Sequence, residues 1–227
     1  MTQALLWGLL AAGSLLIGQL LATPLGHSAR TVGLMMAFGA GTLISAVGYE
    51  LIPEENLQLG WEVGGAFLLG ALVYYAGARI IDRGGTSGRA LFLGALLDGI
   101  PESFILGLGL ALGGSISVAF LAAVLLSNVP EGLAGTTDLR TAGVSERRVT
   151  LMWSSLTVVC GVVSMAGYLV ADHITRAGEI ASAFAGGAVL TMLADSMVPE
   201  SYERAGRVAG LLTVLGFLVA GVLSALQ

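Results

Sequence analysis

The sequence predicts an all-α polytopic membrane protein, a bundle of eight transmembrane helices that forms a single domain over residues 1–227. Of the 227 residues, 56% are hydrophobic and only 11% are charged, whereas soluble domains carry about 25% charged residues. The mean hydropathy is +0.88. Eight apolar runs approach the roughly 20 residues that a helix needs to cross a bilayer, and the polar links between them are too short for a soluble domain.

The eight runs define the expected spans in chain order. They are Ala4–Leu21, Val32–Ile52, Val63–Ile81, Ala90–Leu112, Ile116–Ala134, Val149–Ala171, Ile180–Val198 and Val208–Leu226. No basic residue precedes the first run, as a signal peptide would require, so we interpret it as a span. The longest polar link is expected from Thr136 to Arg148.

The distribution of arginines supports the count of eight. The sequence has no lysine, and if the spans alternate, nine arginines fall on one membrane face and only Arg176 on the other. The positive-inside rule makes the arginine-rich face cytoplasmic. We therefore expect a multi-pass protein of the inner cell membrane with both termini outside the cytoplasm.

An internal repeat links the second and seventh spans. Residues Ala37–Glu54 match Ala183–Glu200 at five of 18 positions, and both segments end in Pro-Glu. Even- and odd-numbered spans run in opposite directions, so the copies are inverted, and the fourth and fifth spans form another related pair. The predicted architecture is thus an inverted repeat of three, two and three spans, an arrangement typical of transporters.

Two related motifs lie in the middle of the fourth and fifth spans. Leu96–Ser103 and Leu125–Gly132 each have two leucines, a polar residue, two further residues and Pro-Glu, 29 positions apart. A carboxylate in an apolar span costs roughly 3 kcal/mol or more at the bilayer centre. A proline cannot donate a hydrogen bond to the carbonyl four residues earlier. We therefore expect interrupted helices here, with the carbonyls of Leu97 and Leu126 released.

The polar side chains of these motifs share helix faces. Asp98 and Glu102 are four residues apart, Ser127 and Glu131 repeat this spacing, and Asn128 lies beside them. If the helices cross, these side chains offer three carboxylates, an amide and a hydroxyl. A divalent cation would offset the cost of burying the carboxylates together. The alternative is a structural one, in which the prolines kink the helices and each Glu bonds to a neighbour.

These motifs, with the eight spans, the outside termini and the Pro-Glu ends of the second and seventh spans, resemble the ZIP (Zrt/Irt-like) family of divalent-metal transporters. The chain is similar to a diverged prokaryotic-type member. In that family the fourth span carries a His-Asn-x-Pro-Glu-Gly motif and the fifth a related one, and together they form the transport site. The resemblance implies that Asp98 takes the His position and Glu102 the Glu position. It implies metal ligands at Ser127, Asn128 and Glu131 in the fifth span.

The chain also departs from the family pattern. No histidine lies within a span, and Ser164 stands where many members have a glutamate that helps to form a second metal site. Because Gly99 also lacks a donor atom, we expect one metal site. A site without imidazole or thiolate favours Mn²⁺, Fe²⁺ or Mg²⁺, although Zn²⁺ also accepts carboxylates; Zn, Mn, Fe and Cd all stay open as the transported substrate.

Two further carboxylates are candidate pathway residues, with Ser164 as a third position. Glu50 lies about a turn inside the second span, next to Glu54, Glu55 and Glu62 at the outer face. This group is either an acidic funnel for cations or ordinary solvated charge. Asp195, one turn before Pro199, is its near-counterpart, and the resemblance places it on the exit path.

The sequence therefore predicts a transporter that moves divalent metal cations, zinc or another transition metal, toward the cytoplasm. The direction follows from the resemblance. The alternative is a diverged ZIP-like protein that binds a cation or proton without transporting metal. The expected partners are metal cations and the lipid bilayer; a homodimer stays open. No nucleic acid is expected, since no basic cluster interleaves with aromatic residues. No enzyme is expected either, because Asp98 lacks the Gly-x-Gly-Asp context of intramembrane proteases.

Overall fold

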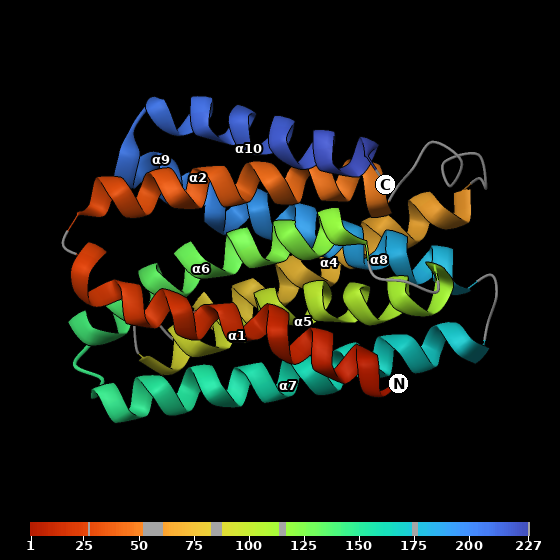
Figure 1. Ribbon diagram of the computed structural model, residues 1–227, viewed down its shortest axis with the longest axis horizontal. Coiled ribbons are helices and arrows are strands. Elements are labelled where there is room, and N and C mark those ends of the chain that lie inside the picture. Colours follow the sequence, from red (N-terminus) through yellow and green to blue (C-terminus); the bar gives the residue numbers. More distant parts are fainter. Residues whose placement is uncertain (27, 52–60, 83–87, 114–116, 174–176, 227) are drawn as a thin grey trace.

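The computed structural model describes residues 1–26, 28–51, 61–82, 88–113, 117–173 and 177–226 (Figure 1). Within these ranges every regular element is a helix and no strand occurs, which confirms the all-α prediction. The elements are α1 (Thr2–Leu25), α2 (Ala29–Ala46), η1 (Val47–Leu51), α4 (Trp61–Asp82), α5 (Gly88–Gly113), α6 (Val118–Thr141), α7 (Glu146–His173), α8 (Ala177–Met192), η2 (Leu193–Met197), α9 (Val198–Ala205) and α10 (Val208–Ala225).

In the described part of the chain, eight helical segments are long and apolar enough to cross a membrane, as predicted. The element η1 continues α2, while α8, η2 and α9 form one segment. Several helices extend beyond their apolar runs, so most of the link predicted from Thr136 to Arg148 is helical. Arg140 pairs with Glu146 at 2.6 Å across the turn that remains.

Both chain ends lie at the same end of the bundle, at the right of Figure 1. The turns between α1 and α2, α6 and α7, and α9 and α10 lie at the opposite end. Arg140 and Arg204 occupy the last turns of α6 and α9 there. We call this the arginine-rich end. An even number of spans explains why the termini meet at the other end.

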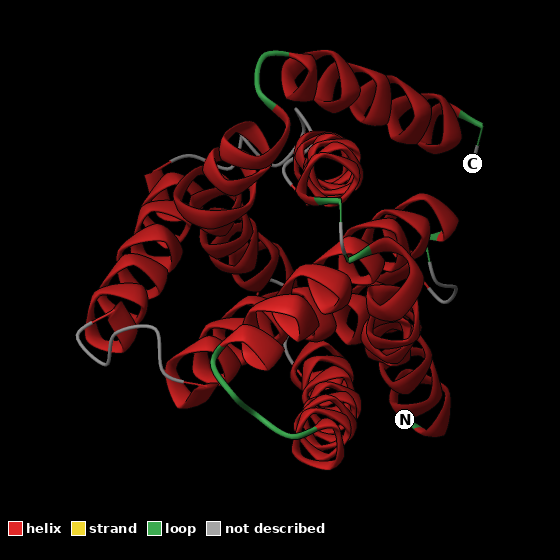
Figure 2. Cartoon of the chain, turned by 90° about the vertical axis from the view of Figure 1, so that its left-hand side faces the viewer, coloured by secondary structure: helices red, strands yellow, loops and turns green. Residues whose placement is uncertain are grey.

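The helices pack as two groups of four spans. The first, here the α1 group, contains α1, α5, α6 and α7; the second, the α2 group, contains α2 with η1, α4, α8 with η2 and α9, and α10. The most extensive helix contacts lie within the groups: α5 with α7 and α1 with α6 in the first, α2 with α10 and α4 with α8 in the second. The groups meet chiefly where α2 packs on α6 and α5 packs on α8. Figure 2 views this arrangement from the arginine-rich end.

Two glycines permit close helix approach within the α2 group. Gly41 lies against the backbone carbonyl of Thr213 on α10, and Gly187 lies against the carbonyl of Phe67 on α4. A Cβ atom at either position would overlap the carbonyl oxygen, so glycine lets these backbones touch. The two contacts are related by an offset of 146 residues, because Gly187 follows Gly41 by 146 positions and Thr213 follows Phe67 by the same number.

The expected interruption of the fourth and fifth spans is wrong. Pro101 lies inside α5 and Pro130 inside α6, and both helices are continuous. Neighbouring helices allow membrane helices to accommodate proline in this way. The carbonyl of Leu126, which loses its donor at Pro130, faces Gly39 of α2, 3.1 Å from where a Cβ of that glycine would lie.

The irregular helix geometry occurs instead in the second and seventh spans. The π-helical segments η1 and η2 are 146 positions apart, the offset that also relates Pro53 to Pro199. Pro199 lies in the first turn of α9, directly after η2. A π-helical turn carries one extra residue and commonly marks a functional position. Pro53 itself lies outside the described residues.

Candidate metal site

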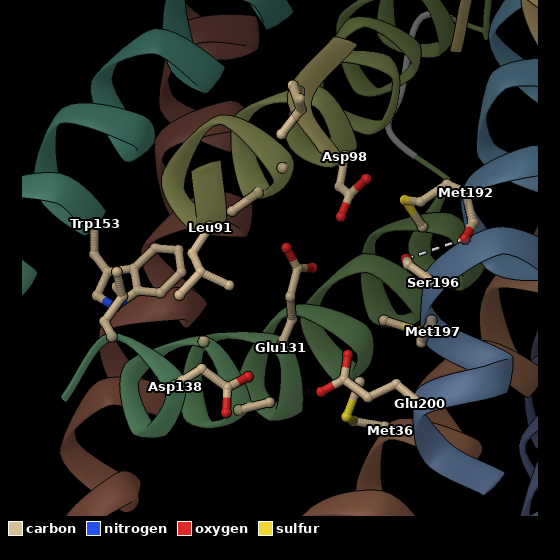
Figure 3. Close-up of a pocket in the computed structure, with 16 residues that line it drawn as sticks. Met36, Leu91, Asp98, Glu131, Asp138, Trp153, Met192, Ser196, Met197 and Glu200 are labelled. Atoms are coloured by element: carbon tan, nitrogen blue, oxygen red, sulfur yellow. Dashed lines mark hydrogen bonds between the residues drawn. The ribbon is translucent and has the colours of Figure 1, made fainter. Parts of the chain in front are cut away.

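A cavity of about 410 Å³ lies where the two helix groups meet. Its wall contains four carboxylates: Asp98 of α5, Glu131 and Asp138 of α6, and Glu200 of α9. Ile81 in the last turn of α4 and Leu91 in the first turn of α5 also line it, so the cavity extends from the middle of the bundle to the arginine-rich end. Figure 3 shows its labelled side chains.

Asp98 and Glu131 come from the two Pro-Glu helices and point toward one another across the cavity (Figure 3). Asp98 lies near the middle of α5, and Glu131 near the middle of α6. The two helices run antiparallel, which brings the two motifs to the same depth. The structure thus brings together these two of the five predicted metal ligands.

Asp98 has a hydrogen-bond partner that its sequence motif does not indicate. The hydroxyl of Tyr74, on α4, donates a hydrogen bond to Oδ1 of Asp98 at 2.5 Å. Tyr74 is only 4% exposed. Its position, 24 residues before Asp98 on another span, gives no local sequence signal, because the contact depends on how α4 packs against α5.

Glu102 lies one turn beyond Asp98, away from the arginine-rich end. Its side chain is 2% exposed and is not part of the cavity wall. Within the described residues, its Oε1 atom is buried and has no hydrogen-bond partner. A buried carboxylate oxygen without a partner is costly, and a cation or a proton would satisfy it.

The other predicted ligands make hydrogen bonds to neighbouring helices or to their own helix. Ser127 donates to the carbonyl of Val124 at 3.0 Å, and the amide nitrogen of Asn128 donates to the carbonyl of Ala11 at 3.1 Å. Ser164, the third predicted pathway residue, donates to the carbonyl of Ala4 at 2.9 Å. All three are buried, and none lines the cavity.

The two predicted pathway carboxylates also lie outside the cavity wall. Glu50, in η1 at the end opposite the arginine-rich end, accepts a hydrogen bond from Ser224 of α10. Asp195 is exposed in η2, whereas the next residue, Ser196, lines the cavity. Glu54 and Glu55 lie outside the described residues, and Glu62 is exposed at the start of α4.

Asp138 and Glu200 at the cavity mouth share a guanidinium group. Arg204 contacts Asp138 Oδ2 at 3.0 Å and Glu200 Oε1 at 2.7 Å, and its side chain is 19% exposed. Glu200 and Arg204 are four residues apart on α9, which suits an ion pair on one helix face. Because Asp138 belongs to α6, Arg204 joins the two helix groups.

In the sequence, Arg204 is one of the nine arginines that predict the cytoplasmic face, and no motif marks Asp138 as a site residue. Asp138 follows Glu131 by seven positions, about two helical turns, so both side chains face the same cavity. Ala134 and Gly135 lie between them on the cavity wall and leave space there. Extending the face of Glu131 along its helix would have found Asp138.

Among the described residues, no three His, Cys, Asp or Glu side chains converge into a ready-made metal cluster. The carboxylates instead line the cavity at two depths, with Asp98 and Glu131 near the middle of the bundle and Asp138 and Glu200 at the mouth. Like charges repel one another and separate unless a cation lies between them. The arrangement can therefore attract a cation electrostatically and hold it between Asp98 and Glu131 if these side chains close on it.

No protein-family model matches the chain. A protein of Arabidopsis thaliana named "putative zinc transporter" is 26% identical over 190 residues. The match covers 76% of this chain but only 30% of the plant protein, so the chain spans less than a third of that relative's length.

Proposed function

We propose that this protein is a ZIP-like transporter of divalent metal cations, zinc or another transition metal. The observation that carries the proposal is the juxtaposition of Asp98 and Glu131, from two antiparallel Pro-Glu helices, inside a cavity between two helix groups. A carboxylate pair at this depth is costly without a counter-charge, and a divalent cation supplies it. The similarity to a protein named as a zinc transporter supports the same role.

In the proposed site, Asp98 and Glu131 are the primary ligands and Glu102 is the third carboxylate. The unpaired oxygen of Glu102 supports its inclusion. Ser127 and Asn128 complete the predicted oxygen set, and they contribute once their side chains turn from their present hydrogen bonds. All of these ligands offer oxygen, which suits Mn²⁺ and Fe²⁺ as well as Zn²⁺.

Thioethers on the cavity wall favour a transition metal over Mg²⁺. Met36, Met192 and Met197 line the cavity, and Met36 and Met197 lie near Glu200 in Figure 3. Thioether sulfur is a soft ligand that transition metals accept and Mg²⁺ does not. The thioethers of these side chains can contact a partly dehydrated transition metal as it passes through the cavity.

The proposed direction is toward the arginine-rich end, which the positive-inside rule makes cytoplasmic. The protein then lies in the inner cell membrane with both termini outside the cytoplasm. The cavity reaches that end through Asp138 and Glu200, which are partly exposed. These two carboxylates, rather than Asp195, form the proposed exit path, and Ser196 lies on the same wall.

We further propose that the architecture is an inverted repeat that supports alternating access. The π-helical segments η1 and η2 share the 146-residue offset of the two Pro-Glu segments. The glycine contacts of α2 with α10 and of α8 with α4 correspond under the same offset. In the proposed repeat α1 corresponds to α7 and α6 to α5, and the contact of α1 with α6 is matched by that of α7 with α5. Repeats of this kind open alternately to the two sides of a membrane.

Uptake of a panel of divalent metals into proteoliposomes tests the proposal. We expect saturable uptake of at least one transition metal, and a fall of at least roughly 10-fold in Asp98→Asn and Glu131→Gln, since losing even an outer hydrogen-bond partner of a metal ligand typically costs about 10- to 100-fold. Glu203→Gln is the matched control, because Glu203 is an exposed carboxylate outside the cavity wall. Uptake of no metal, or equal uptake by all the variants, would contradict transport through this site.

A second candidate function is cation binding without transport. The lack of three converging metal-ligand side chains in the described residues favours it. Calorimetric binding of Mn²⁺ or Zn²⁺ that depends on Asp98 and Glu131, without any uptake into proteoliposomes, would support this alternative.

A further inference from the structure

Helix α4 contributes one buried polar side chain to the interior. Of its described residues, only Val63, Gly70 and Tyr74 are buried, and most of the others are exposed. Such a helix is expected to face lipid over most of its surface. The phenol of Tyr74 nevertheless reaches the carboxylate of the proposed metal site.

The hydrogen bond between Tyr74 and Asp98 belongs to a strong class. A hydroxyl that donates to a carboxylate gives a short, charge-assisted hydrogen bond, and the distance here is 2.5 Å. The ring of Tyr74 is part of the buried hydrophobic core of the protein. Packing therefore fixes the ring, and the ring fixes the position of its hydroxyl.

The hydrogen bond engages one oxygen of Asp98 and so defines the plane of the carboxylate. In Figure 3 this carboxylate points toward Glu131. Without the phenol, Asp98 could rotate about its side-chain bonds toward other positions in a cavity of about 410 Å³. Hydrogen bonds from outer residues orient metal ligands in this way in many proteins.

We propose that Tyr74 is a positioning residue of the metal site: its hydroxyl holds Oδ1 of Asp98, so that the carboxylate faces Glu131 and binds one divalent cation through its other oxygen. This proposal rests on the proposed transport function. It gives Asp98 a single-oxygen mode of binding, which resembles the one-donor binding of an imidazole more than the two-donor binding of a free carboxylate.

The hydrogen bond between Tyr74 and Asp98 joins the two helix groups and therefore depends on tertiary structure. Tyr74 belongs to the α2 group and Asp98 to the α1 group. Few side-chain hydrogen bonds in the described residues cross between the groups; the others are those of Thr42 to Ala123 and of Arg204 to Asp138. The geometry of the metal site is thus set by contacts across the group boundary.

The variant Tyr74→Phe tests this inference, since it removes only the hydroxyl. We expect the KM for uptake of Mn²⁺ or Zn²⁺ into proteoliposomes to rise by about tenfold, with the maximal rate changed by less than about twofold. Tyr75→Phe is the matched control, because Tyr75 is exposed and its ring packs under Arg79. The Cζ atom of Arg79 lies 4.9 Å from the centre of the Tyr75 ring. This control should leave KM unchanged.

A spectroscopic measurement on the full chain separates positioning from general packing. Binding of Mn²⁺ or Zn²⁺ at Asp98 should perturb the near-ultraviolet absorption of a tyrosine. The difference spectrum should be present in the wild type and in Tyr75→Phe, and absent in Tyr74→Phe. A difference spectrum that persists in Tyr74→Phe would overturn the proposal.

The outcomes distinguish this proposal from the function on which it rests. If Asp98→Asn transports like the wild type, the proposed function itself fails. If Asp98→Asn loses uptake while Tyr74→Phe retains the wild-type KM, the metal site stands and the role of Tyr74 is refuted. A lower maximal rate with unchanged KM, together with a lower melting temperature, would also refute it, because Tyr74 would then act on folding alone.

Discussion

Arg204 places a positive charge at the mouth of the cavity. It pairs with Asp138 on α6 and with Glu200 on α9, and these two carboxylates are 38% and 33% exposed. Partial exposure lets solvent screen the pairs, so their contribution to stability is modest. The guanidinium nevertheless occupies the position at which a cation leaving the cavity would meet both carboxylates.

Replacing Arg204 by glutamine should weaken the contact between the two helix groups. We expect a loss of about 1 kcal/mol in the free energy of unfolding, after discounting for solvent screening, visible as a lower melting temperature in detergent. Arg207→Gln is the control, since Arg207 is exposed in the following turn. The same destabilisation in an Asp138→Asn, Glu200→Gln background would show that these pairs are not its cause.

Residues of the site differ in how far sequence alone predicts them. Asp98 and Glu131 follow from their motifs, because an ionisable residue in an apolar span is unusual. Tyr74 and Arg204 act through contacts between distant helices. Neither their identity nor their spacing shows which carboxylate they reach, so only the packing of the helices reveals them.

At the scale of helices, close backbone contacts hold the α2 group together. Gly187 lies against the carbonyl of Phe67, where no Cβ atom fits without a shift of α4 or α8. Gly187→Ala should therefore destabilise the protein by roughly 1–3 kcal/mol, the usual cost of overpacking. The measurement is thermal unfolding in detergent.

The matched control is Gly109→Ala on α5. Gly109 is exposed, and nothing lies within 4 Å of a Cβ atom placed there. Alanine also favours a helix more than glycine, so this variant should be as stable as the wild type or more so. Equal melting temperatures for the two variants would mean that the contact between α8 and α4 can relax at little cost.

The sequence predicts that some helices are irregular, but it does not predict which ones. The Pro-Glu motifs predicted broken helices at Pro101 and Pro130, yet α5 and α6 continue through both. The π-helical segments lie instead in η1 and η2. A proline limits only local hydrogen bonding, and neighbouring helices decide whether the chain kinks, widens or continues.

For the whole molecule, hydropathy predicted the eight spans because the bilayer fixes the length of each apolar run. The same information does not give the packing order. Contacts of α2 with α10 and of α5 with α7 join helices that are not sequence neighbours. The division into two groups, and the cavity between them, therefore emerge only in the folded structure.

A cation at the proposed site would be bound by carboxylates of the α1 group and enclosed by side chains of the α2 group. Asp98 and Glu131 belong to the α1 group, while Tyr74, Glu200 and the cavity methionines belong to the α2 group. Relative movement of the groups would change the access to the site without dismantling its two primary ligands. This arrangement suits a transporter better than a static cation store.

Anomalous X-ray scattering from crystals soaked in Mn²⁺ or Zn²⁺ tests the proposed metal site, because it locates the metal without reference to activity. We expect one peak between the carboxylates of Asp98 and Glu131, and we expect it to be lost in crystals of Glu131→Gln. Peaks only at surface carboxylates, or a second peak beside Asn128 and Ser164, would contradict a single metal site between the two Pro-Glu helices.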